Sequence, residues 1–148
     1  MALVKNFPLE LSSIPQTRIT HDPQSFLERA REQLRLDDFR QATEKLWGSA
    51  SLALGEIASQ LGYQTQSHNV KNLLFRILVS QCVDSNERKQ WTQAWRDAQF
   101  CHKNFYDDSL NAEEVNELGE IVQSLVEMMT TIDLSKFDKQ KFERGCSK

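Results

Sequence analysis

One short stretch of the sequence combines residue types that can cleave a phosphodiester. Arg96 is followed by Asp97 and, six positions after the arginine, by His102. An imidazole can take up and return a proton near neutral pH, and a guanidinium can hold a phosphate and the charge that develops on it. On a helix, Arg96 and His102 lie roughly 9 Å apart along the axis and about 120° around it. The two side chains would therefore flank a groove, which a second copy of the chain could complete.

Other catalytic and metal-binding patterns are missing from the sequence. It contains no HExxH, CxxC or EF-hand spacing, no Gly-rich phosphate loop and no GxSxG elbow. His21, His68 and His102 are far apart along the chain, so we expect no metal and no cofactor. Cys101 precedes His102 directly, but adjacent residues on a helix point about 100° apart, which argues against a Cys–His catalytic pair.

The composition is typical of an intracellular helical domain. The 148 residues are 39% hydrophobic and 26% charged and include only five Gly and three Pro. No apolar stretch approaches the ~20 residues that cross a bilayer, and no signal peptide begins the chain. The three cysteines form no CxxC pair, which favours free thiols in a reducing compartment. We expect a cytoplasmic protein, or a nuclear one, with no membrane partner.

The charges are segregated along the chain. Residues 71–106 carry six Lys and Arg against three acids, whereas residues 107–133 carry eight acids and no Lys or Arg. Opposite patches can steer two copies of a chain together, so we expect a homodimer through the helix that holds Arg96 and His102, where Trp91, Trp95 and Ala98 form an apolar stripe. The plainer interpretation of the segregated charges is that they are solvated helix faces.

Hydrophobic periodicity places two helices in the first part of the chain. Asp22 is a suitable N-cap and Pro23 a suitable first helical residue, so the first helix should begin there. Apolar residues then recur every three or four positions over residues 39–61, with Gly62 as a C-cap, which predicts the strongest helix of the chain. Small residues around Gly48 would let another backbone approach closely.

Two further helices follow by the same criteria. The third has its apolar residues over positions 70–78 and ends near residues 82–85. The fourth runs over about 85–106 and carries the Arg96 to His102 stretch. Asp84, with Glu87 three positions on, predicts a capping box at its start.

The last part of the chain predicts one more helix and a short tail. Asn111 with Glu114 predicts a capping box that opens a fifth helix, whose outer face is acidic. The basic tail, residues 134–148, is loosely amphipathic through Phe137 and Phe142, which suits a short helix or a docked segment.

These elements predict an all-α fold. No alternating strand pattern of useful length occurs. We expect an irregular N-terminal arm over residues 1–20 and a helical domain over residues 21–133. The domain should be an up-and-down bundle of five helices joined by short loops, or of six if the tail adds one.

The motif and its surroundings resemble the HEPN superfamily of small helical proteins. Arg96, polar Asp97 and His102 look like the RxxxxxH signature of that superfamily, with a polar residue after the arginine. Three stretches look like the corresponding parts of a small archaeal repeat-type branch: ATEKLWGSASLAL at 42–54, SHNVKNLL at 67–74 and HKNFYDD at 102–108. The resemblance covers about residues 23–130.

That resemblance implies a fold, an activity and a set of site residues. It implies a HEPN-like bundle, frequent dimerisation along the motif helix and, in active members, metal-independent endoribonuclease activity. Arg96 and His102 would be catalytic, Asp97 would support them, and Tyr106 would be a neighbour one turn on. RNA, a nucleotide or another protein would be the partner.

A non-catalytic role is the alternative. Many HEPN proteins only bind nucleotides or partner proteins, so the chain could be an interaction or regulatory subunit. The helices of residues 26–61 also resemble one tetratricopeptide-type unit, although no second copy follows at a 34-residue period. His102 would then be a packed histidine and Arg96 a surface residue, and Trp91 and Trp95 suit core packing in either case.

Overall fold

The computed structural model describes residues 21–64 and 67–147 of the chain. This part contains six α-helices and no strand, which confirms the all-α prediction. The predicted arm over residues 1–20 lies outside the described residues. The helices are α1 (Pro23–Arg35), α2 (Phe39–Gln60), α3 (His68–Cys82), α4 (Arg88–Asp107), α5 (Ala112–Thr131) and α6 (Lys139–Cys146).

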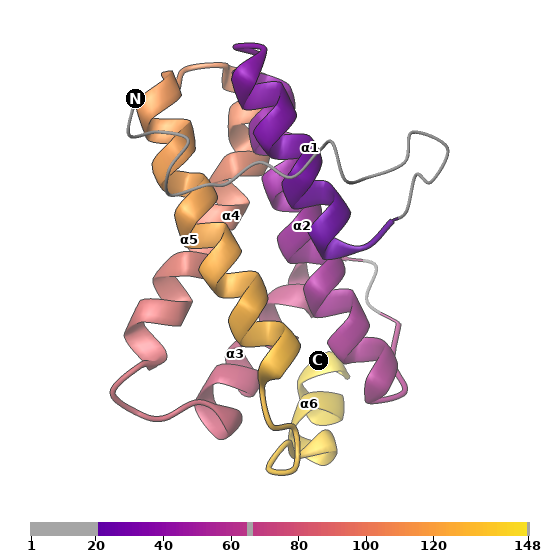
Figure 1. Cartoon of the computed structure of the whole chain (residues 1–148). Helices are drawn as coiled ribbons and strands as arrows, with labels where there is room; N and C mark the ends of the chain where they lie inside the picture. Colours follow the sequence, from indigo (N-terminus) through magenta and orange to yellow (C-terminus); the bar gives the residue numbers. More distant parts are fainter. Residues whose placement is uncertain (1–20, 65–66, 148) are drawn as a thin grey trace.

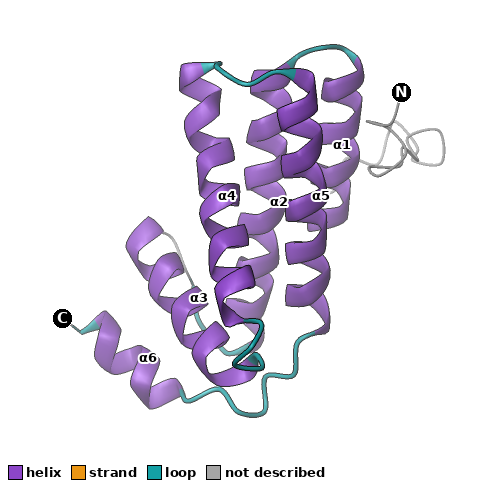
Figure 2. Cartoon of the chain, turned by 90° about the vertical axis from the view of Figure 1, so that its left-hand side faces the viewer, coloured by secondary structure: helices purple, strands orange, loops and turns teal. Residues whose placement is uncertain are grey.

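Four of the helices form the predicted up-and-down bundle. Helices α1, α2, α4 and α5 run side by side, and the turns from α1 to α2 and from α4 to α5 lie at the same end of the bundle (Figures 1 and 2). The remaining two helices add to this bundle: α3 is tilted beside the lower part of α4 in Figure 2 and packs on α4 and α6. None of the described helices has the length and apolar content that a membrane span needs.

The centre of the bundle is α2, as its periodicity predicts. Ala42, Leu46, Ala50 and Ile57 all lie in the core, together with the indole of Trp47. Helices α1 and α2 form a hairpin, as one tetratricopeptide-type unit would, but α2 also packs against both α4 and α5. The hairpin is therefore part of the bundle core, not a unit that offers a free concave face.

Helix boundaries follow the capping residues at most positions. The Asp22 carboxylate accepts from the Ser25 backbone N–H at 2.7 Å. At the start of α5, Asn111 and Glu114 form both hydrogen bonds of the predicted capping box, at 2.8 and 3.0 Å. After α2, Gly62 has φ +88°, the left-handed conformation that a glycine C-cap supplies.

The predicted capping box of α4 is wrong. This helix begins at Arg88, not at Ser85, and its N-cap Glu87 makes no side-chain capping bond. The backbone N–H of Glu87 donates to the carbonyl of Asp84 at 2.9 Å, which closes a turn ahead of the helix. The Glu87 carboxylate accepts instead from the Trp91 indole N–H at 3.3 Å. A tryptophan one turn into the helix thus takes the carboxylate that the box would need.

Gly48 permits a close approach, but to a ring and not to a backbone. An added Cβ at this position would lie 2.8 Å from Cδ1 of the Phe26 ring on α1. At Gly55, two turns on, an added Cβ would meet nothing within 4 Å. The same helix therefore holds one glycine that packing requires and one that it does not.

The two glycines should respond in opposite ways to substitution by alanine. Gly55→Ala is expected to raise the free energy of unfolding by about 1 kcal/mol, because alanine favours the helix. Gly48→Ala gains the same propensity but must displace Phe26, at an overpacking cost of about 1–3 kcal/mol, so it should not stabilise. Urea unfolding of both variants measures the difference. Equal stabilisation by both substitutions would contradict the Phe26 contact.

Helix α6 is docked on α3 and on Tyr63, in the loop after α2, through aromatic and polar contacts. Phe142 is 2% exposed, and its ring meets the edge of Tyr63 at a centroid distance of 4.9 Å. The Tyr63 hydroxyl donates to Glu143 Oε2 at 2.8 Å, and the Asp138 backbone N–H donates to Gln81 Oε1 at 2.8 Å. Desolvation, followed by the hydrogen bond to Glu143, raises the pKa of Tyr63 to about 12.

The phenol of Tyr63 should therefore report on the docking of α6. In a Tyr106→Phe background Tyr63 is the sole tyrosine, and its ultraviolet absorbance should titrate at a pKa of about 12. Adding Glu143→Gln removes the neighbouring negative charge, so the midpoint should fall toward the ordinary value of about 10. A midpoint that Glu143→Gln leaves unchanged would contradict the contact.

Candidate functional site

His102 projects from α4 toward α2. Its side chain is 32% exposed, and Nδ1 lies 2.9 Å from Glu44 Oε1 on α2. Because an ionised carboxylate only accepts hydrogen bonds, Nδ1 carries the proton in this contact. The other ring nitrogen, Nε2, takes no part in this contact.

A second imidazole lies beside the first. His68 is the first residue of α3, which Ser67 caps, and its ring stacks on His102 at a centroid distance of 5.8 Å. Both rings also meet Trp47, His68 at 5.4 Å and His102 at 5.7 Å. Because α3 and α4 each contribute one imidazole, the pair depends on how these helices pack on α2.

A lysine also contacts the Trp47 ring. Lys71, one turn after His68, has Nζ 5.8 Å from the Trp47 ring centroid and donates to Ser51 Oγ at 2.7 Å. Burial lowers the pKa of Lys71 from its ordinary value. We call Glu44, Trp47, His68, Lys71 and His102 the two-histidine cluster.

Two buried aromatic side chains, Trp95 and Phe75, pack against the two-histidine cluster through Trp47. Trp95 is buried, contacts Trp47 at a centroid distance of 5.5 Å and stacks on Phe75 at 4.8 Å. The Trp95 indole N–H donates to Asn72 Oδ1 at 2.8 Å, and Gln99 Nε2 donates to the same oxygen at 2.6 Å. One amide on α3 thus fixes two side chains of α4.

Of the residues that the sequence singled out, Tyr106 lies next to His102 and Arg96 does not. The Tyr106 ring is 70% exposed and meets His102 edge-on at 5.7 Å. Arg96 is exposed on another face of α4, and in the described part of the chain its guanidinium has no hydrogen bond or ion pair. The Cys101 thiol is buried, and this burial raises its pKa, so it is no nucleophile in this state.

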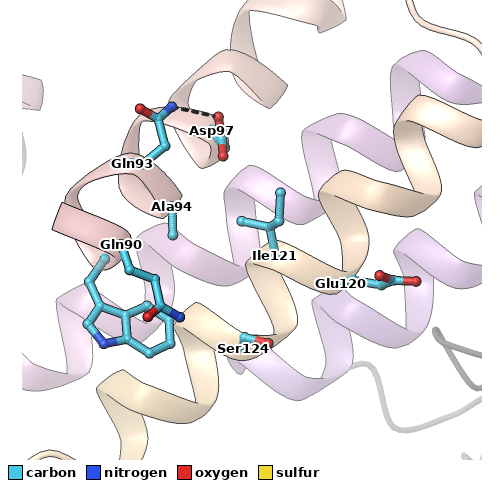
Figure 3. A pocket seen from close by; sticks show the side chains of 8 residues that line it. Gln90, Gln93, Ala94, Asp97, Glu120, Ile121 and Ser124 are labelled. Atoms are coloured by element: carbon cyan, nitrogen blue, oxygen red, sulfur yellow. Dashed lines mark hydrogen bonds between the residues drawn. The ribbon is translucent and has the colours of Figure 1, made fainter. Parts of the chain in front are cut away.

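Asp97 points to the opposite side of α4 from His102. It borders a cavity of about 450 Å³ between α4 and α5, which Glu120, Ile121 and Ser124 line from α5 (Figure 3). Its Oδ1 accepts from Gln93 Nε2 at 3.1 Å. His102 faces α2 and α3 instead, so the structure does not bring Asp97 to the imidazole.

The apolar stripe of α4 is used inside the chain. Trp95 and Ala98 lie in the core, and Trp91 packs against its edge. The exposed face of α4 instead presents Arg96, Phe100 and Tyr106. A contact between two copies through α4 would therefore use that face and not the stripe.

Sequence reasoning missed His68, Glu44 and Lys71. The stretches 42–54 and 67–74, which look like the archaeal repeat-type branch, contain all three residues. Only packing shows that Glu44 and His68 contact His102 and that Lys71 contacts Trp47. In the described residues, no group of three or more His, Cys, Asp or Glu side chains is arranged to hold a metal ion.

Comparison with known families gives one match. The model of the family described as "Archaeal PaREP1/PaREP8 family" matches residues 21–126. The chain belongs to the PaREP1/PaREP8 family. The PaREP1/PaREP8 match spans α1 to α4 and most of α5, so it includes the whole two-histidine cluster and excludes α6. No curated protein and no solved structure matches the chain significantly.

The two hydrogen bonds that Asn72 accepts from Trp95 and Gln99 predict that its substitution lowers stability. Asn72→Ala leaves the buried Trp95 indole N–H and the Gln99 amide without their acceptor, so the free energy of unfolding should fall by about 1–3 kcal/mol. The matched control is Asn69→Ala, an exposed asparagine on the same helix, which should change it by less than about 0.5 kcal/mol. Urea unfolding that shows equal effects would contradict the shared acceptor.

Proposed function

We propose that the chain is a metal-independent endoribonuclease whose acid and base are the imidazoles of the two-histidine cluster. The observation that carries the proposal is the position of His68 and His102, with ring centroids 5.8 Å apart and one ring held by Glu44. Two imidazoles at this separation can act on one phosphodiester, one taking the proton of the 2′-hydroxyl and the other giving a proton to the 5′ oxygen. The HEPN resemblance of Arg96 and His102 points to the same chemistry.

The reaction needs two proton transfers and no other reagent. The 2′-hydroxyl oxygen attacks the adjacent phosphorus, a 2′,3′-cyclic phosphate forms, and the bond from phosphorus to the 5′ oxygen breaks. His102, held at Nδ1 by Glu44, takes the 2′-hydroxyl proton at Nε2. His68 gives a proton to the departing 5′ oxygen. The scheme therefore requires one imidazole to act as the base and the other as the acid.

Two cations would stabilise the charge that develops on the phosphate. Lys71 contacts the same Trp47 ring as the two imidazoles, with Nζ 5.8 Å from the ring centroid. Arg96 is about 120° around α4 from His102, so we propose that it reaches the phosphate from a second copy docked on the exposed face of α4. Phe100 and Tyr106, exposed beside it, would pack in that homodimer. The three cysteines of the chain are free thiols, which favours action in the reducing cytoplasm.

RNA cleavage in EDTA tests the proposed acid and base. With a mixed RNA pool as substrate, His102→Ala and His68→Ala are each expected to slow cleavage by about 10²-fold or more. His21→Ala is the matched control, because His21 lies ahead of α1 and outside the cluster, and it should cleave like the wild type. The proposal would be contradicted if the wild type did not cleave RNA, or if cleavage survived both substitutions in the cluster.

Mixing two inactive variants tests the composite site. Arg96→Ala alone should slow cleavage by about 10²-fold. A one-to-one mixture of Arg96→Ala and His102→Ala chains should recover about a quarter of the wild-type activity, because half of the dimers then hold one intact site out of two. No recovery, or sedimentation as a pure monomer, would count against a shared site.

A non-catalytic binding module is the second candidate. It is favoured by the outer face of α4, where two exposed aromatic rings, Phe100 and Tyr106, stand beside the exposed charges of Arg96 and Lys103. Such a face suits stacking and phosphate contacts, or a protein partner. RNA that binds to the wild type but stays intact would favour this candidate over the nuclease.

A further inference from the structure

A second concave site lies between α3 and α6, away from the two-histidine cluster. Its volume is about 510 Å³, in the range of small-molecule sites. Arg76 borders it about 12 Å along α3 from His68 and about 80° around that helix. Besides Arg76 it is lined by Leu73, Ile77, Ser80, Lys141, Arg144 and Gly145.

The charged lining of this cavity has one sign. Arg76, Lys141 and Arg144 border it, and no acid does. In the described part of the chain none of the three forms an ion pair. The acids of the α6 region are engaged elsewhere, since Glu143 accepts from the Tyr63 hydroxyl and the Asp138 carboxylate accepts from the Lys141 backbone N–H.

Apart from Ser80, the uncharged lining of this cavity is apolar, and α6 packs closely against it. Leu73 and Ile77 form an apolar wall on α3. Gly145 brings α6 so near that an added Cβ would lie 2.6 Å from Leu73 Cδ2. The Phe142 and Tyr63 contacts hold α6 in this position, so cations from two helices converge beside an apolar surface.

We propose that this cavity binds a nucleoside di- or triphosphate. Three cations match the charge of a di- or triphosphate, and guanidinium groups bind phosphate oxygens in a bidentate fashion. Leu73, which is partly exposed, offers the base an apolar contact, with the buried Ile77 behind it. The Ser80 hydroxyl donates to the Ile77 carbonyl at 2.9 Å, so its oxygen remains an acceptor for a ribose hydroxyl. The site lies partly on α6, outside the family match, and does not depend on the proposed nuclease activity.

Calorimetric titration with three probes tests the ligand class. The wild type is expected to bind ATP with one-to-one stoichiometry, tripolyphosphate more weakly, and adenosine more weakly than ATP. Equal affinity for ATP and tripolyphosphate would overturn the nucleotide assignment, because the apolar wall would then contribute nothing. A ribo-oligonucleotide that binds there more tightly than ATP would overturn it in favour of an RNA backbone site.

Paired charge variants test the location. Arg76→Gln with Arg144→Gln should weaken ATP binding by about tenfold or more for each charge removed. The matched control, Lys89→Gln with Arg35→Gln, removes two exposed cations outside the cavity and should leave the affinity within about twofold. Urea unfolding of each variant checks that the fold is intact. Unchanged ATP affinity in the cavity variant, or equal losses in both pairs, would overturn the proposal.

Discussion

The packing of Trp47 is the contact on which the candidate site depends. This indole is 7% exposed in the middle of α2, and it touches His68 from α3 and both Trp95 and His102 from α4. Each imidazole therefore has the same neighbour, and the indole sets their spacing. Glu44, one turn before Trp47 on α2, fixes the orientation of His102 from the same helix. A single helix thus positions two side chains that arrive from two other helices.

Helix α3 separates two environments of different chemistry. The side toward α2 and α4 carries His68, Lys71 and Asn72, which take part in the cluster and in its support. The side toward α6 carries Arg76 and Ser80, which border the basic cavity. The family match includes α3 but ends before α6, so the first environment lies wholly within the matched residues. The second is completed by the chain's own C-terminal helix.

Local features of the fold could be predicted from the sequence, and long-range ones could not. Asn111 and Glu114 are three positions apart, so their capping box depends on neighbours that the sequence displays. The same spacing failed at Asp84 and Glu87, because residues 84–87 form a turn ahead of the helix and Glu87, not Asp84, is the N-cap. His102 and Glu44 are 58 positions apart, and only bundle packing brings them together. The motif therefore identified one imidazole of the pair and could not identify the other.

The central claim is that His68 and His102 act as one catalytic unit on the surface of Trp47. A double-mutant cycle of RNA cleavage under single-turnover conditions tests it most directly. If the two imidazoles serve the same reaction, the double variant His68→Ala/His102→Ala should cleave about as slowly as the slower single variant. A rate reduced by the full product of the two single effects would contradict the claim, because the residues would then act independently.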